Sequence, residues 1–356
     1  MGRGGFDGGV KRKSGERRRL VRLGLGLLLT LGTCLILLRQ PYISLRKDLL
    51  PTGPVDGQEA ELDAALARRV CPAYRLGDQP SVAFLHIPKT AGMLLVETFQ
   101  GLMPDDGQGR WCTREGTDPD LPPVYSTCSS GQPDADHLAL YNATRANFLK
   151  TCSGFAAHQD YAFFEATGID PTRTVTLIAL RHPVDRVISD YFYSIKVGAE
   201  WMADYKPANA TDFSGLERFV LENRETLNNI GTQMVGSARH CNFPGTGPNT
   251  PMDQVLEVAT RNLERTCVIL LTEDMEESLA RLGRAAGWPG EMVTAVARAQ
   301  EEKSRAQAGM RVNATPKPEV PQAVRELIAR QNSLDMQLYD YAVRLFKREG
   351  AALATS

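Results

Sequence analysis

Two common signatures of metal and nucleotide sites are missing from this sequence of 356 residues. None of its seven cysteines belongs to a Cys-x-x-Cys pair or to another spacing typical of a zinc site, so no metal is expected. The Gly-x-x-x-x-Gly-Lys sequence of a Walker A loop is also absent, which argues against an ordinary ATPase or P-loop nucleotide kinase. Nor does the sequence contain an internal repeat.

Acidic residues outnumber basic ones outside the N-terminal arm. Residues 1–47 carry 11 Lys/Arg and 2 Asp/Glu, whereas the remaining 309 residues carry 30 Lys/Arg and 40 Asp/Glu. A body with a formal charge of −10 is a poor general binder of nucleic acid, so no nucleic-acid partner is expected. An anionic ligand would have to be held by a local site.

One charge-free run stands out in the arm. Residues 23–38 (LGLGLLLTLGTCLILL) are 16 residues without a charge, Leu20 and Val21 extend them, and the flanking arginines can snorkel toward the headgroups. Eight basic residues precede the run and three follow it, which places the N-terminus in the cytosol. We expect residues 20–39 to be the signal-anchor of a type II membrane protein. The alternatives are a cleaved signal peptide, for which no small-x-small site follows closely, and a buried helix.

Two features agree with a lumenal body. Asn-x-Thr sequons stand at Asn142, Asn209 and Asn313. Six cysteines lie beyond the anchor, an even number that allows three disulfides in fifteen possible pairings, with free buried thiols as the alternative. They are Cys71, Cys112, Cys128, Cys152, Cys241 and Cys267. The expected organisation is a basic cytosolic tail (1–19), the anchor (20–39), a lumenal stem (40–79) and a globular domain (80–348).

Strand-like and helix-like patterns alternate along this domain. Buried strands are predicted at residues 81–87, 174–180 and 267–271, with a short strand before His158. Helices are predicted at residues 92–103, 184–196, 213–222, 226–235, 253–263, 275–287 and 321–348, and residues 110–131 read as a disulfide-tied loop. This order predicts an α/β fold with a parallel β-sheet flanked by helices on both faces. A ligand would then lie at the carboxyl ends of the strands.

The segment HIPKTAG, residues 86–92, joins the first strand to the first helix. A loop entering a helix N-terminus offers unpaired amides and the positive end of the helix dipole, which together bind an anion. Ala91 and Gly92 let this backbone approach a phosphate, while Lys89 adds a positive charge and Thr90 a hydroxyl. The alternative is an ordinary strand–helix turn with a solvated lysine.

A second strand end carries the segment LIALRHPVDRVISDYFYS. It places Arg181 at the end of a buried strand and Ser189 about two turns into the next helix. Arginine offers a planar fork suited to phosphate and serine a nearby hydroxyl. The alternative for Arg181 is an ion pair with Asp185 or Asp190.

Together these segments resemble the PAPS-dependent sulfotransferases, which take sulfate from 3′-phosphoadenosine-5′-phosphosulfate (PAPS). FLHIPKTAG and ALRHPVDRVISDYFYS are most similar to the Golgi carbohydrate branch, particularly the heparan and uronosyl 2-O-sulfotransferases and their 6-O relatives. The resemblance implies the P-loop-like sulfotransferase fold, binding of the 5′-phosphosulfate by Lys89, Thr90, Ala91 and Gly92, and a Golgi location. It further implies that Arg181 and Ser189 bind the 3′-phosphate.

The same resemblance extends to a late segment and to a catalytic base. Thr315 and Lys317 match positions that close over the nucleotide, with an exposed loop as the alternative. His158 matches the histidine that acts as general base in the 2-O enzymes. His86 and His182 stand at strand ends, where a packed or backbone-bonded imidazole is expected. Lys89 would stabilise charge on the leaving phosphate without a metal.

Two departures from the family pattern bear on activity. Met93 and Leu94 follow Gly92 where the family commonly has Ser or Thr, and Phe155 and Ala156 stand where the 2-O enzymes keep a second histidine near the base. The sequence therefore predicts a membrane-anchored carbohydrate O-sulfotransferase acting on a glycan. A catalytically impaired glycan- or nucleotide-binding relative is the alternative. The acceptor hydroxyl and the oligomeric state stay open.

Overall fold

The computed structural model describes residues 56–76, 78, 80–103, 110–112, 152–158, 160–166, 168–209, 211–223, 227–239, 250–306 and 318–355. The chain divides into two units, residues 1–54 and 55–356, and all of these residues belong to the second. The predicted tail, the anchor and the first part of the stem lie outside them. Among the residues described, no helix is long and apolar enough to cross a bilayer.

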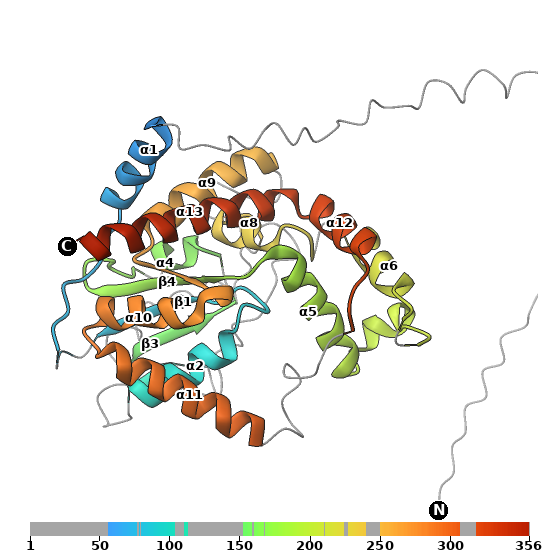
Figure 1. Cartoon of the computed structure of the whole chain (residues 1–356), viewed down its shortest axis with the longest axis horizontal. Coiled ribbons are helices and arrows are strands. Elements are labelled where there is room, and N and C mark those ends of the chain that lie inside the picture. Colours follow the sequence, from blue (N-terminus) through green and yellow to red (C-terminus); the bar gives the residue numbers. More distant parts are fainter. Residues whose placement is uncertain are drawn as a thin grey trace, which may run out of the picture. The chain divides into compact units, whose positions relative to one another are not determined.

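A parallel sheet forms the centre of this unit (Figure 1). Its five strands lie in the order β2-β3-β1-β4-β5, and every neighbouring pair is parallel. They are β1 (Ser81–Leu85), β2 (Arg110–Cys112), β3 (Cys152–Ala157), β4 (Thr174–Leu180) and β5 (Val268–Leu271). All seven residues of β4 are buried, as expected for a central strand covered on both faces. The prediction of a parallel sheet is confirmed, and β2 is an additional strand inside the loop predicted at 110–131.

Helices cover both faces of the sheet because successive side chains of β1 point to opposite sides. Val82 and Phe84 pack in one apolar cluster with α2, α10 and α11. Ala83 and Leu85 pack in another with α4, α8, α9 and α13. Helix α1 (Asp56–Ala67) joins this second face beside α13. The bounds are α2 (Gly92–Leu102), α4 (Ala162–Ala166), α8 (Ile230–Val235), α9 (Met252–Arg265), α10 (Met275–Ala286), α11 (Gly290–Ala306) and α13 (Ser333–Thr355).

A third apolar cluster lies beyond the carboxyl end of β4. It is formed by α5 (Pro183–Lys196), the 3-10 helix η2 (Glu200–Tyr205), α6 (Ser214–Glu222) and α12 (Gln322–Gln331). Tyr191 is buried at its centre and donates a hydrogen bond of 2.6 Å to the Tyr205 carbonyl. This cluster fixes α5, which carries Ser189, against α12.

The prediction of a single helix at residues 321–348 is wrong, because two helices, α12 and α13 (Ser333–Thr355), occupy this region. The chain breaks at Asn332, between α12 and α13, where φ is −113° and ψ is 34°. The Asn332 side chain is fully buried, accepts a hydrogen bond from the Asn229 amide and donates to Asn228 Oδ1. These bonds to a distant turn hold Asn332 out of helical geometry. Helix α11 was not predicted, and α8 begins at Ile230 rather than 226.

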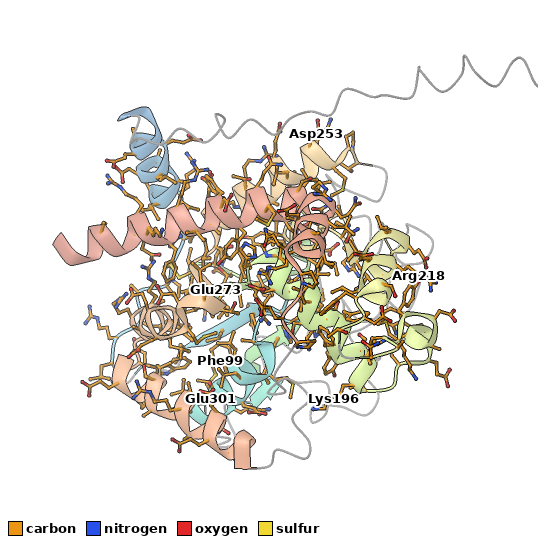
Figure 2. The ribbon with its side chains drawn as sticks, turned by 45° about the vertical axis from the view of Figure 1, so that its right-hand side comes forward. Phe99, Lys196, Arg218, Asp253, Glu273 and Glu301 are labelled. Carbon is orange, nitrogen blue, oxygen red and sulfur yellow. A yellow bond between two sulfur atoms is a disulfide. The ribbon has the colours of Figure 1, made fainter. Side chains whose placement is uncertain are left out.

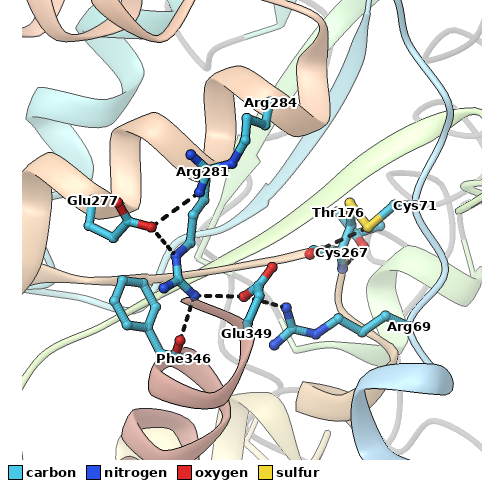
Figure 3. Close-up of polar contacts among 9 residues, drawn as sticks. All are labelled: Arg69, Cys71, Thr176, Cys267, Glu277, Arg281, Arg284, Phe346 and Glu349. Carbon is cyan, nitrogen blue, oxygen red and sulfur yellow. Dashed lines mark hydrogen bonds and ion pairs between the residues drawn. A yellow bond between two sulfur atoms is a disulfide. The ribbon is translucent and has the colours of Figure 1, made fainter. Parts of the chain in front are cut away.

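A disulfide and a buried arginine link segments that are distant in the sequence (Figure 3). Cys71 and Cys267 are bonded, which ties the segment after α1 to the start of β5. The Arg281 side chain is buried between α10 and α13, where it pairs with Glu277 and Glu349. Of the three disulfides that the six cysteines beyond residue 47 allow, one is therefore present; nothing is described of the side chains of the other four.

Candidate functional site

Three chain segments leave the sheet side by side at its carboxyl edge. Strand β1 lies between β3 and β4, with Leu85 opposite both Ala157 and Ile178. His86 after β1 therefore lies beside His158 after β3, and Arg181 follows β4 on the other side. The structure thus brings together three of the predicted site segments, which are far apart in the sequence.

The loop after β1 has the form of an open anion cradle. Lys89 and Ala91 both adopt positive φ, at 71° and 63°. Ala91 is the N-cap of α2 and offers no side-chain cap, and the first turn holds no acidic residue. The first amides of α2 are thus left to an external partner. Thr90 is 1% exposed and its hydroxyl donates to the Ile87 carbonyl at 2.8 Å, so in this state it braces the loop.

Gly92 permits a close contact beneath this loop. A Cβ atom at this position would lie 1.6 Å from His86 Nε2. Only a residue without a side chain lets α2 begin directly against the His86 imidazole. The glycine expected to admit a phosphate therefore also makes room for a histidine.

His86 and His158 form a ring pair. Their ring centroids lie 4.0 Å apart with an interplanar angle of 34°, and the His86 ring also stacks on Phe84 at 5.3 Å. His86 is partly exposed, and its imidazole contacts Phe84, His158 and the start of α2 at Gly92. Burial, with smaller contributions from His158 and Lys89, lowers the pKa of His86 well below its ordinary value. His86 is thus a neutral neighbour of the predicted base.

Lys89 contacts both the second strand end and helix α5. The Lys89 ammonium lies 3.5 Å from the centroid of the Tyr193 ring, a cation–π contact. The Lys89 carbonyl accepts a hydrogen bond of 3.4 Å from Arg181 Nη1. Tyr193 was not among the predicted site residues, and it is 37% exposed. Its spacing of four residues from Ser189, on one helical face, was the available signal.

Arg181 lines a cavity between α5 and α12. The cavity has a volume of about 630 Å³, and its lining includes Arg181, Asp185, Ile188 and Arg325. Ser189 follows Ile188 on α5 and is 4% exposed. The predicted Thr315 and Lys317 lie outside the described residues, directly before the Pro318 that lines this cavity.

His182 is the N-cap residue of α5, and its ring packs against a neighbouring tyrosine. Its amide donates to Glu273 Oε1 at 2.8 Å, and its ring meets Tyr339 edge-on at 5.6 Å between centroids. Glu273, labelled in Figure 2, also accepts a 2.8 Å hydrogen bond from the Tyr339 hydroxyl. Within the described part of the chain, no cluster of His, Cys, Asp and Glu could hold a metal ion.

Comparison with known proteins agrees with this geometry. A search among curated proteins found no match. The model of the sulfotransferase family matches residues 72–342, which span the sheet, the loop after β1, α5, α12 and the first part of α13. Because this match covers well over half of the sequence, the chain belongs to the sulfotransferase family, a family of enzymes that transfer sulfuryl groups.

Proposed function

We propose that this protein transfers the sulfuryl group of PAPS to a hydroxyl of a glycan. The family generally uses PAPS as donor. The observation that carries the proposal is the meeting of three strand ends: the uncapped loop at Lys89, the Arg181 side chain against that loop, and His158 beside it. A cation, open amides and an imidazole at one edge are what sulfuryl transfer needs.

The residues fit PAPS in two places. The open N-terminus of α2 and Lys89 suit the 5′-phosphosulfate, because amides at a helix start and a nearby ammonium favour an anion. Arg181, which lines the cavity of about 630 Å³, and Ser189, which follows the lining residue Ile188 on α5, suit the 3′-phosphate. PAPS supplies the sulfuryl group, and a phosphate leaves with the electrons of the broken sulfur–oxygen bond.

His158 acts as general base in this proposal. It takes the proton of the acceptor hydroxyl as that oxygen bonds to sulfur. The neutral His86 ring beside it adds no repelling charge when His158 becomes an imidazolium. Lys89, whose ammonium rests on the Tyr193 ring, stabilises the charge that develops on the leaving phosphate oxygen.

The acceptor and location are inferred from the sequence. The negative body favours a neutral or weakly charged glycan over a highly sulfated polymer. A signal-anchor at residues 20–39 would place the enzyme in the Golgi membrane with its catalytic domain in the lumen. The Cys71–Cys267 disulfide supports an oxidising compartment.

The competing function is nucleotide or glycan binding without turnover. Met93, 60% exposed at the first turn of α2, offers no hydroxyl to a phosphate, which favours this alternative. Lys89, His158, Arg181 and Ser189 are all retained, which favours the enzyme. Both functions include ligand binding, but only the enzyme transfers a sulfuryl group.

The test is transfer of sulfur-35 from PAPS to a panel of natural and desulfated glycans by the full-length chain. Lys89→Ala and His158→Ala are compared with Lys303→Ala, which removes an exposed lysine on α11. We expect label in wild type and Lys303→Ala, and a loss of about 10²- to 10⁴-fold in His158→Ala. Nucleotide binding without transfer to any glycan would favour the binding protein, and no nucleotide binding would reject both the enzyme and a nucleotide-binding protein.

A further inference from the structure

The cavity between α5 and α12 contains a second arginine that neither the motifs nor the family match assigns. Arg325 belongs to α12 and lines the same cavity as Arg181 at the end of β4. The two side chains come from segments that lie far apart in the sequence. A pocket with guanidinium groups from two sides is suited to a dianionic phosphate, which each group can contact through a planar fork.

The start of α12 adds to the positive character of this cavity. Pro321 is the N-cap, it provides no side-chain cap, and the first turn holds no acidic residue. Pro321 and Gln322 both line the cavity, so the positive end of this ten-residue helix lies at its wall. The acidic groups of the lining are Glu319, which is exposed, and Asp185.

Asp185 forms an ion pair with Arg325 in this state. Arg325 Nη2 lies 2.9 Å from Asp185 Oδ1, and the two side chains are 35% and 39% exposed. An ion pair this accessible to water adds little to stability, so an anion of higher charge can replace the carboxylate. Asp185 also stands one helical turn before Ser189, on the same face of α5.

We propose that Arg325 is a ligand of the nucleotide 3′-phosphate, and that Asp185 holds its guanidinium until the nucleotide enters. The inference rests on the proposed use of PAPS, and assigns the 3′-phosphate to a clamp of Arg181 from β4 and Arg325 from α12. Release from Asp185 turns Arg325 toward the phosphate, and the ion pair re-forms when the product leaves.

The test measures binding of adenosine 3′,5′-bisphosphate and adenosine 5′-monophosphate to the full-length chain by calorimetry. Arg325→Ala should weaken binding of the bisphosphate by about tenfold and leave the monophosphate unchanged, because a charge-assisted contact to one phosphate is lost. Arg330→Ala is the matched control, since Arg330 is an exposed arginine of the same helix outside the cavity lining. Asp185→Asn should tighten bisphosphate binding, because Arg325 no longer has to leave a carboxylate.

The outcomes distinguish a failure of the Arg325 clamp from a failure of the proposed use of PAPS. Equal weakening of both nucleotides, or no change in Arg325→Ala while wild type binds the bisphosphate, would overturn the clamp and leave PAPS use intact. Weaker bisphosphate binding in Asp185→Asn would also contradict it. If wild type binds neither nucleotide, the proposed function itself fails. Thermal unfolding of each variant identifies any loss that arises from misfolding.

Discussion

The imidazole of His86 lies against Gly92 so closely that a methyl group at residue 92 would overlap His86 Nε2, at 1.6 Å. The same imidazole contacts the His158 ring, with 4.0 Å between the ring centroids and the two planes tilted by 34°. The start of α2, the loop of Lys89 and the predicted base are thus packed as one unit. A change at Gly92 should reach the base through His86.

Gly92→Ala tests this packing. The added methyl group must displace the His86 ring, and overpacking of this kind costs about 1–3 kcal/mol of unfolding free energy. We expect a lower thermal midpoint together with loss of sulfuryl transfer. Gly290→Ala is the matched control, because the atom nearest to a Cβ there lies 3.9 Å away. Unchanged stability and activity in Gly92→Ala would show that His86 can move without consequence.

The pH dependence of stability should reveal the neutral state of His86. Its pKa in the folded protein lies well below the ordinary value, which the unfolded chain regains. As the pH falls below about 6.5, the unfolded chain takes up a proton that the folded protein refuses, so stability falls, by at most about 1.4 kcal/mol per pH unit. Denaturant unfolding at several pH values between 7.5 and 5 should show a shallower decline in His86→Gln. Identical slopes in the two proteins would contradict a depressed pKa.

Tyr193 should position Lys89 for catalysis. The contact of its ring with the ammonium, at 3.5 Å, corresponds to about 0.5–2 kcal/mol, so Tyr193→Leu should lower kcat/KM by about 2- to 30-fold. Tyr193→Phe keeps the ring face and should stay near wild type. Steady-state kinetics with varied PAPS measures both. A higher kcat/KM in Tyr193→Leu would mean that the ring holds Lys89 away from the donor.

The motifs near the strands could be predicted because their signals are local. The β-branched run of β4 and the proline at the start of α5 each indicate the local structure from a few adjacent residues. The pairing of His86 with His158 could not be predicted, since it depends on β1 and β3 being neighbours in the sheet. A sequence pattern does not contain strand order.

The prediction of one continuous helix through Asn332 failed for a related reason. Residues 321–348 keep a helical pattern throughout, but the buried Asn332 amide bonds to Asn228 and to the Asn229 backbone, about a hundred residues away. A tertiary contact therefore overrides the local preference for helix. The consequence is functional, because the break allows α12 to lie beside α5 and bring Arg325 into the cavity.

The disulfide between Cys71 and Cys267 should be a large part of the domain's stability. It closes a loop of 196 residues, and the chain-entropy relation gives a stabilisation of about 5 kcal/mol for a loop of this length, because the unfolded chain is so strongly constrained. Cys71→Ser with Cys267→Ser should lower the denaturant midpoint by a correspondingly large amount. Reductant should destabilise wild type toward the level of the double variant and leave the double variant itself unaffected. If wild type were insensitive to reductant under conditions that reduce all its thiols, the bond would contribute nothing. Its tie between the segment after α1 and β5 would then have to be carried by packing alone.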